Sequence, residues 1–215
     1  MKPILYSFKR CPYAMRARIV LLLANIKCEL REVRLNNKPK QMLQASPKGT
    51  VPVMVIENKI IDESIDIINW ALIQNDIFKG NLSDGDLLLT EELISIFDND
   101  FKSNLDRYKY STRYKDVDAK FHREQCFKIL LDLEKIILPG RWIFGKEINK
   151  VDICILPFIR QYKIADPAWF DSQEDIPKVR KLLNNFQEYE IFKEVMINYE
   201  VWEEGSHPVY FPTSR

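Results

Sequence analysis

The sequence predicts an α/β domain at the N-terminus followed by an all-α domain. Residues 1–75 alternate between short apolar strand patterns and helical patterns, which is typical of an α/β domain. Residues 76–86 contain Gly80, Ser83, Asp84 and Gly85 and have the composition of a linker. No clear strand pattern follows, so residues 87–215 are expected to form an all-helical domain. A chain of 215 residues is long enough for two small domains.

The N-terminal domain is expected to have the element order β-α-β-α-β-β-α. Its first helix starts at Pro12, because the missing N–H of proline costs nothing at a helix start. A tight turn at residues 57–59 joins the last two strands. The expected strands are 4–8, 28–35, 51–56 and 59–61, and the expected helices are 12–25, 38–44 and one opened by Asp62-Glu63-Ser64.

The C-terminal domain is expected to contain only helices. Asn149 and Asp152 have the spacing of a helix cap, in which Asn149 bonds the first free N–H groups and Asp152 reaches back. The sequence has no internal repeat and no low-complexity segment. The expected helices are 87–108, 117–137, 151–164 and 177–198.

Composition and charge exclude several classes of protein. Hydrophobic residues make up 46% and charged residues 29%, close to the average for a globular protein. The net charge is only +1, so the chain lacks the basic character of a general nucleic-acid binder. Residues 1–80 carry 13 Lys and Arg against 7 Asp and Glu, whereas residues 81–215 carry 19 against 24. The basic N-terminal part favours a small anionic ligand, although an unevenly charged surface gives the same counts.

The sequence also predicts a cytoplasmic protein without membrane or metal partners. The longest apolar run, residues 19–24, is much shorter than the ~20 residues that span a bilayer. The N-terminus enters a strand pattern with no signal-peptide core. The four cysteines lack Cys-x-x-Cys spacing and nearby histidines, so we expect reduced thiols and no zinc. They are Cys11, Cys28, Cys126 and Cys154.

Cys11 is the candidate nucleophile. It lies where the first strand ends and a helix begins, beside unpaired N–H groups and the positive end of the helix dipole. Lys9, Arg10 and Arg16 add positive charge nearby. These surroundings favour the thiolate, which is the reactive form of cysteine. A buried structural cysteine is the competing interpretation, and we prefer it for the other three cysteines because they lie in apolar segments.

Two further segments are candidates for ligand binding. Pro52 starts a strand, which leaves the preceding backbone at Val51 free to pair with a ligand. At the start of the next helix, the N–H and hydroxyl of Ser64 suit a carboxylate, and Glu63 suits an ammonium group. Ordinary helix capping is the simpler interpretation of Glu63-Ser64 taken alone.

Together these segments resemble the thioredoxin-like N-terminal domain of cytosolic glutathione transferases. The resemblance rests on Cys-Pro-Tyr-x-x-Arg from Cys11, Ser-Pro-x-Gly-x-Val-Pro-Val from Ser46, and Asp-Glu-Ser from Asp62. The helical half, with Asn-x-x-Asp-Ile from Asn149 and then Pro157, is similar to their C-terminal domain. Residues 10–18 and 35–39 are most similar to the omega class, which uses cysteine.

The resemblance implies a glutathione site around Cys11. Cys11 would form a mixed disulfide with the glutathione sulfur, and the ring of Tyr13 would lie beside that sulfur. Val51, preceding a cis Pro52, would pair its backbone with the cysteinyl unit.

The two ends of glutathione would meet other residues. Glu63 and Ser64 would hold the γ-glutamyl end, and Lys38 would meet the glycyl carboxylate. Two-domain glutaredoxins, which the chain also resembles, have a second cysteine where this chain has Ala14. Without it, release of the mixed disulfide would need a second glutathione.

The activity implied is that of a glutathione-dependent thiol transferase or reductase. It would remove glutathione from disulfides or thioethers, or reduce small oxidants such as dehydroascorbate, with glutathione as co-substrate. One alternative is a glutathione S-transferase that conjugates electrophiles, which a cysteine is expected to support weakly. Another is a non-catalytic, transferase-like binding protein, against which Cys11 beside positive charge argues.

The resemblance also implies a homodimer and an acceptor pocket between the domains. The acceptor would be a small molecule or a protein disulfide. Four aromatic residues are candidates for lining the pocket, and helix packing explains each of them equally well. They are Tyr108, Tyr110, Tyr162 and Trp169.

Overall fold

The computed structural model describes residues 2–78 and 82–213, and the chain forms two compact units. The sheet unit comprises Met1–Ile77 and Tyr189–Arg215, and the helical unit comprises Phe78–Glu188. The predicted linker, 76–86, includes residues 79–81, which lie outside the described residues. Within the described ranges, no helix has the length and apolar character needed to cross a bilayer.

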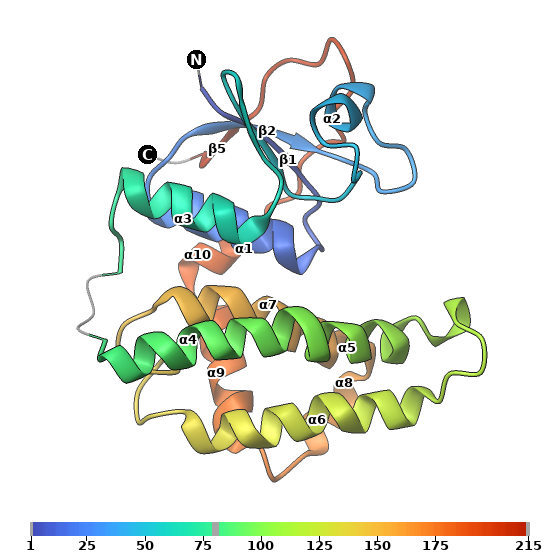
Figure 1. Cartoon of the computed structure of the whole chain (residues 1–215), viewed down its shortest axis with the longest axis vertical. Helices are drawn as coiled ribbons and strands as arrows, with labels where there is room; N and C mark the ends of the chain where they lie inside the picture. Colours follow the sequence, from blue (N-terminus) through green and yellow to red (C-terminus); the bar gives the residue numbers. More distant parts are fainter. Residues whose placement is uncertain (1, 79–81, 214–215) are drawn as a thin grey trace. The chain divides into compact units, whose positions relative to one another are not determined.

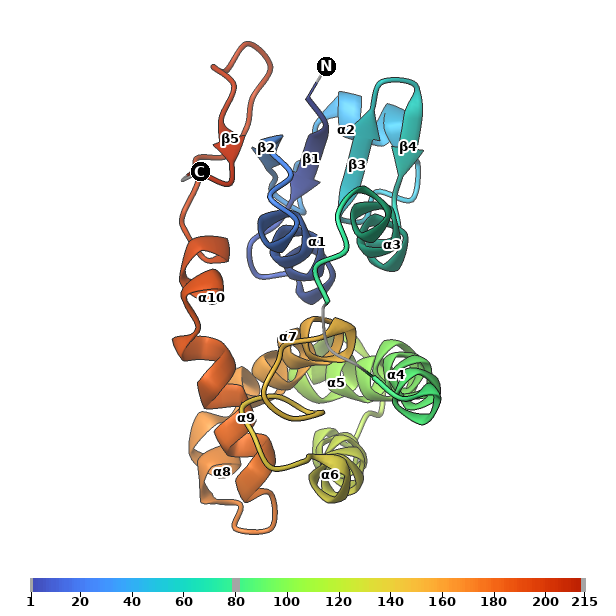
Figure 2. The ribbon, with the colours of Figure 1, turned by 90° about the vertical axis from the view of Figure 1, so that its left-hand side faces the viewer.

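The sheet unit has the predicted thioredoxin-like arrangement. Its strands are β1 Ile4–Ser7, β2 Cys28–Glu32, β3 Val53–Ile56, β4 Lys59–Ile61 and β5 Tyr210–Phe211, and its helices are α1 Pro12–Leu23, α2 Lys40–Ala45, α3 Ser64–Gln74 and α10 Glu190–Val195. The strand order is β4-β3-β1-β2-β5 (Figure 2). β1 and β2 are parallel, and the other neighbours are antiparallel. α1 and α3 cover one face of the sheet and α2 the other (Figure 1).

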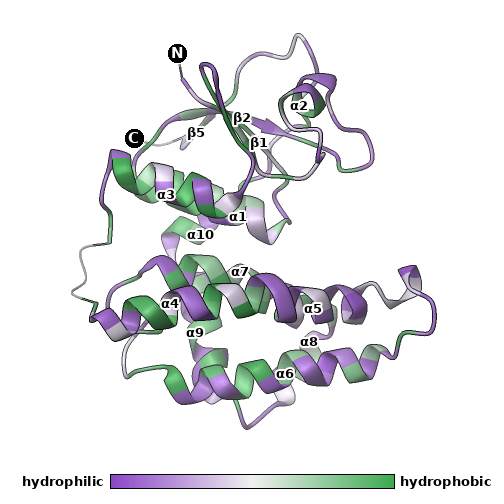
Figure 3. Cartoon of the chain, in the orientation of Figure 1, coloured by the Kyte–Doolittle hydropathy of each residue, from purple (hydrophilic) through white to green (hydrophobic). Residues whose placement is uncertain are grey.

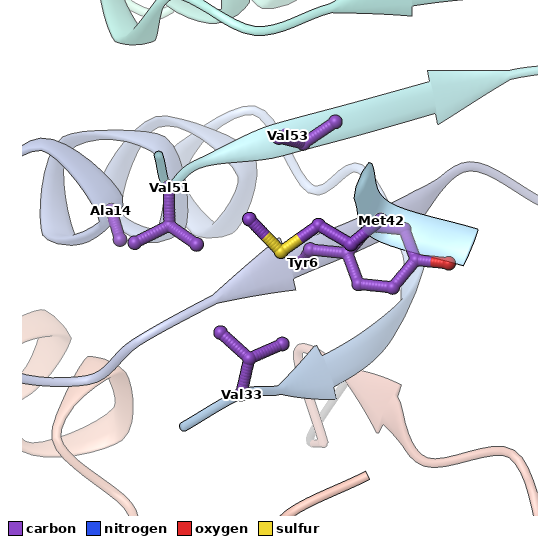
Figure 4. Close-up of a cluster of buried hydrophobic side chains, with 6 residues drawn as sticks. All are labelled: Tyr6, Ala14, Val33, Met42, Val51 and Val53. Atoms are coloured by element: carbon purple, nitrogen blue, oxygen red, sulfur yellow. The ribbon is translucent and has the colours of Figure 1, made fainter. Parts of the chain in front are cut away.

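The core of the sheet unit explains why α1 is apolar nearly all round. Residues from Ala14 to Leu22 are buried, because α1 packs against both α3 and α10. A cluster near the start of β3 joins these layers, and in it Val51 lies beside Ala14 (Figure 4). Each buried Val or Met side chain contributes about 1.5–3 kcal/mol. The cluster consists of Tyr6, Ala14, Val33, Met42, Val51 and Val53.

Apart from an isolated β-bridge between Trp142 and Gly145, the described residues of the helical unit form helices and turns. They are α4 Asp84–Ile96, a π-helical turn Phe97–Phe101, α5 Lys102–Lys109, a 3-10 turn Ser111–Arg113, α6 Ala119–Ile136, α7 Lys150–Ala165, α8 Pro167–Ser172 and α9 Pro177–Glu188. Hydrophobic and hydrophilic residues alternate along α4 and α6 (Figure 3), as expected for helices that bury one face. This arrangement confirms the predicted helical half.

The predicted cap of α7 is present. The Asn149 side chain accepts a hydrogen bond from the N–H of Val151 at 3.0 Å. The Asp152 carboxylate accepts from the N–H of Asn149 at 2.9 Å and from that of Ile143 at 3.0 Å. Burial raises the pKa of Asp152 to about 7, although the two N–H donors oppose that shift.

Several helix boundaries differ from the predicted ones. The predicted helix 87–108 contains the π-helical turn, and the predicted helix 177–198 is interrupted at Tyr189, whose ψ of 133° is extended. The short helix α8 had no clear apolar period in the sequence, but its start is capped by Asp166, which accepts from the N–H of Trp169 at 3.1 Å. These differences leave the order of elements unchanged.

The C-terminal segment, residues 189–213, differs most from the predicted domain division. The sequence placed it in an all-helical domain of residues 87–215, whereas it belongs to the sheet unit and supplies β5. β5 pairs with β2 through Cys28 opposite Phe211 and Glu29 opposite Tyr210. It satisfies the outer edge of β2, which would otherwise expose unpaired N–H and C=O groups. A two-residue strand is too short to show a period in the sequence.

Candidate functional site

Cys11 lies where the sequence placed it, at the start of α1. It is the N-cap residue, with extended backbone angles of −76° and 125°, and Pro12 follows as the first helical residue. Its N–H donates to the carbonyl of Phe8 at 2.9 Å, which closes a turn after β1. Its side chain is half-buried and therefore reachable from solvent. The thiol thus lies at the positive end of a twelve-residue helix.

Val51 is the residue that the structure brings to Cys11. The Cys11 Sγ lies 3.6 Å from the carbonyl oxygen of Val51. The bond between Val51 and Pro52 is cis, as the resemblance implied, and both residues precede β3. The backbone before β3 therefore borders the thiol.

Glu63 and Ser64 lie at the start of α3, where each has a different partner. Glu63 is the N-cap residue but its carboxylate makes no capping hydrogen bond. It forms an ion pair with Lys48 at 2.7 Å, and its side chain is 62% exposed. The capping interpretation of Glu63 is therefore wrong, and its carboxylate faces solvent with one lysine beside it.

Lys48 is a residue of this region that the sequence analysis did not single out. Its ammonium group contacts Asp62 at 3.3 Å as well as Glu63. Both hydrogen bonds raise the pKa of Lys48, and the bond to Glu63 has the larger effect. Asp62 accepts a hydrogen bond from the Ser46 hydroxyl at 2.7 Å, which is the main reason that its pKa is lowered. The only signal in the sequence was the position of Lys48 between Pro47 and Gly49, within the motif from Ser46.

Ser64 is held by a buried arginine. Arg16 is fully buried, and its guanidinium donates to the Ser64 hydroxyl at 3.3 Å. The same guanidinium lies 5.2 Å from the centre of the Tyr13 ring. Arg16 therefore links the first turn of α1 to the first turn of α3.

Lys38 lies outside this group of contacts. It lines a groove of about 340 Å³ together with Arg34, Asn37, Trp202 and Glu203, among others. Its Nζ also passes Gly49, whose φ of +63° suits glycine, and a Cβ there would lie 3.5 Å from that nitrogen. The described contacts do not join Lys38 to Cys11.

The other cysteines are buried. Burial raises the pKa of Cys28 and of Cys126 to about 12, so both thiols are protonated at neutral pH. Cys154 is fully buried in α7. Cys11 is thus the one partly exposed thiol among the four cysteines, all of which lie in described residues.

The aromatic candidates belong to the helical unit. The buried ring of Tyr162 packs against Tyr108 at 5.6 Å and edge-on against Trp169 at 5.9 Å. Its hydroxyl donates to the carbonyl of Arg123 at 2.8 Å, so Tyr162 is a core residue. Tyr110 is more exposed, with the Arg113 guanidinium 4.2 Å from its ring centre.

Comparisons with known proteins agree with this architecture. Residues 5–76 match the family described as "Glutathione S-transferase, N-terminal domain". The chain is 38% identical over 172 residues to glutathione S-transferase omega-1 of Sus scrofa, covering 75% of this chain and 67% of that protein. It is 25% identical over 189 residues to the chloroplastic glutathione S-transferase DHAR3 of Arabidopsis thaliana, covering 85% of this chain and 67% of that protein.

A solved structure shares the whole fold. It is a glutathione transferase family member from Pseudomonas fluorescens with two glutathione bound, and its TM-score is 0.78 with 16% identity. The likeness covers 91% of this chain and 92% of that one. At this identity the likeness establishes the fold only.

Proposed function

Because this chain belongs to the glutathione transferase superfamily, we propose that it is a glutathione-dependent thiol transferase or reductase with Cys11 as its nucleophile. The observation that supports the proposal most directly is the half-buried Cys11 thiol at the start of α1, 3.6 Å from the Val51 carbonyl. A helix N-terminus stabilises a thiolate, which is the attacking form.

The proposed reaction proceeds by two thiol–disulfide exchanges. The Cys11 thiolate attacks the glutathionyl sulfur of a mixed disulfide, so a bond forms between the two sulfurs and the acceptor thiol leaves and takes a proton. A second glutathione thiolate then attacks the sulfur of the adduct, which releases glutathione disulfide and restores the Cys11 thiolate. Ala14 occupies the position of a resolving cysteine and is fully buried, which supports the need for a second glutathione.

The remaining contacts to glutathione are assigned by the resemblance. Val51 and Pro52 would present backbone to the cysteinyl unit, with Tyr13 beside the sulfur. Glu63 would bind the γ-glutamyl ammonium. The Ser64 hydroxyl and N–H at the start of α3 would hold the γ-glutamyl carboxylate, with Arg16 behind the hydroxyl.

Lys38 is the assigned partner of the glycyl carboxylate. Its position on a groove with Arg34 and its cationic side chain support that role. The proposed glutathione-binding residues are thus Tyr13, Lys38, Val51, Pro52, Glu63 and Ser64. No metal ion enters the proposed reaction, and a reducing compartment such as the cytoplasm would supply the glutathione.

The test is the intact mass of the protein after incubation with glutathione disulfide. We expect one glutathionyl adduct, which peptide mapping locates on Cys11, and which excess glutathione removes. The Cys11→Ser variant should gain no adduct, whereas the matched control Cys154→Ala should gain it at the wild-type rate. An adduct on another cysteine, or none, would contradict the proposal, and rapid conjugation of an aryl chloride by the Cys11→Ser variant would favour the conjugating transferase.

We also infer a homodimer, as the family resemblance implies. Apolar side chains with large exposed fractions support it, among them Ile73 at 81% and Leu88 at 74%. Sedimentation velocity of Leu88→Glu should show a shift toward monomer relative to wild type. Phe121→Glu, which alters another exposed apolar side chain, is the control.

A further inference from the structure

The turn that carries Cys11 is held by a buried ion pair. Arg18 on α1 is fully buried and pairs with Glu32 at the end of β2, whose side chain is 10% exposed. The second oxygen of the Glu32 carboxylate accepts a hydrogen bond from the N–H of Lys9 at 2.8 Å. Lys9 lies inside the turn that the Cys11 N–H closes on Phe8. Glu32 therefore fixes the backbone two residues before the thiol.

The ion pair has several further partners. Arg18 Nε donates to the Ser7 hydroxyl at 2.8 Å, and Arg18 Nη1 donates to the carbonyl of Val195 at 3.2 Å. Val195 is the last residue of α10, so the guanidinium donates to one of the carbonyl groups that the end of that helix leaves without an intrahelical partner. A buried ion pair is held in one geometry only when its remaining donors and acceptors are satisfied.

The C-terminal segment, residues 189–213, contacts Arg18, Lys9 and Glu32. Val195 meets Arg18, the Asn198 side chain accepts from the Lys9 ammonium, and the Trp202 N–H donates to the Glu32 carbonyl at 2.8 Å. Glu32 also forms a parallel bridge with Val201. The segment thus contacts every residue that links β2 and α1 to the Cys11 turn.

We propose that the C-terminal segment, acting through Arg18, Glu32 and Lys9, positions Cys11 for reaction. Arg18 and Glu32 are positioning residues, because they act on Cys11 through the backbone of Lys9. Without the contacts of the segment to Lys9 and Glu32, the turn would be less ordered and the Cys11 side chain would no longer be held in one position at the helix N-terminus. The inference rests on the proposed function for its consequence in catalysis, but its structural part is measured without glutathione.

The test compares Glu32→Gln with Glu29→Gln in the full chain. Both changes remove one negative charge from β2, and Glu29 is also paired with an arginine, Arg31, at 2.7 Å. Two readouts are used, amide hydrogen exchange over residues 8–11 and the pH dependence of Cys11 alkylation by iodoacetamide. The high pKa of Cys28 and Cys126 keeps those thiols out of the alkylation signal.

We expect Glu32→Gln to speed amide exchange at Lys9, because the N–H loses its charged acceptor, and to slow alkylation at pH 7, because a thiol that is not held at the helix N-terminus has less thiolate. Each rate should change about tenfold. Glu29→Gln should change neither rate. Alkylation as fast as in wild type, with unchanged exchange at Lys9, overturns the inference even if the variant is less stable to urea.

Asn198→Ala keeps the test decisive if Glu32→Gln does not fold. Asn198 is exposed, so its truncation leaves the core intact, and it removes only the contact of the segment with Lys9. As with Glu32→Gln, we expect faster amide exchange at Lys9 and slower alkylation of Cys11. Exchange and alkylation rates equal to those of wild type overturn the inference. If wild-type Cys11 gains no glutathionyl adduct but these rates change as expected, the proposed function fails and the positioning role stands.

Discussion

The helices of the two units begin in different ways. In the helical unit, side chains close the first turns of α4, α6, α7 and α8 by accepting hydrogen bonds from backbone N–H groups, and the residues are Ser83, Asp118, Asn149 and Asp166. The start of α9 is closed by Glu134 of α6, whose carboxylate accepts from the N–H groups of Lys178 and Val179. In the sheet unit, the N-cap residues of α1, α2, α3 and α10 make no capping hydrogen bond with their side chains.

This difference in helix capping suggests that helix starts stabilise one unit and bind a ligand in the other. A capping side chain stabilises a helix by about 1 kcal/mol and occupies the N–H groups that an anion would use. α1 and α3 lack such side chains at Cys11 and Glu63, the residues to which we assign chemistry and binding. The helical unit uses its helix starts for stability, whereas the sheet unit leaves two of them without a capping side chain, and these are the two that the proposed function assigns to glutathione.

The largest expected effect is on the closed start of α7. Asp152→Ala should lower the free energy of unfolding by about 3–5 kcal/mol, because the buried N–H groups of Ile143 and Asn149 lose their acceptor. Urea denaturation measures this loss, and the rate of Cys11 glutathionylation should not change. Asp86→Ala, at the same position of the exposed capping box of α4, is the control and should cost far less. If Cys11 reacted more slowly in Asp152→Ala than in wild type, stability and ligand binding would not be assigned to different units.

The pH dependence of stability tests the same carboxyl. Burial raises the pKa of Asp152 to about 7 from its ordinary value of 3.8, so the folded protein binds a proton more tightly than the unfolded chain does. Stability from this group is complete below pH 3.8 and is lost as pH rises toward 7, by up to about 4 kcal/mol. Asp152→Asn should therefore lack the decline between pH 4 and pH 7. Parallel curves of unfolding free energy against pH for the two proteins would contradict the raised pKa.

Glu63→Ala tests the open start of α3. Because Glu63 makes no capping bond, its removal should leave the melting temperature unchanged. Glutathione binding should weaken about tenfold, or roughly 1–2 kcal/mol, which is modest because the carboxylate is 62% exposed. Calorimetric titration and a melting curve on the same sample measure both quantities. Asp66→Ala in the same helix is the control, and a drop in melting temperature without weaker binding would return Glu63 to a structural role.

The smallest expected effect comes from Lys48. In the free protein it pairs with Glu63, so an incoming ammonium group has to displace it. Lys48→Gln should therefore strengthen glutathione binding, by about twofold, since exposed pairs contribute little. Weaker binding in the same titration would instead mean that Lys48 contacts the ligand itself.

Local patterns explain what the sequence predicted well. Cys11-Pro12 marks a helix start, and Asn149 with Asp152 marks another, because both signals lie within four residues and need no knowledge of the fold. The strand-and-helix order of residues 4–74 follows from the same kind of pattern, whereas α10 and β5 of the sheet unit do not. The cis bond before Pro52 came from the family resemblance, and the contact of Cys11 with the Val51 carbonyl was visible only in the structure.

Contacts between distant residues explain what was missed. Arg16 was expected to add charge beside Cys11, but α1 is covered by α3 and α10, and Arg16 lies in the interior against Ser64. In β2 the inward positions are Cys28, Leu30 and Glu32, so a charged residue stands where the strand pattern favours an apolar one, and it pairs with Arg18. Neither partner could be identified without the tertiary structure.

The return of the chain to β2 has a consequence for synthesis. β2 leaves the ribosome long before Tyr210–Phe211, with which it pairs, and at about 5–20 residues per second the interval is roughly 10–40 s. Throughout that time the nascent sheet has an open outer edge, the kind of surface at which chains aggregate. The sheet thus cannot complete its pairing until Tyr210–Phe211 have been synthesised, and a chaperone that shields the edge of β2 would act in that interval.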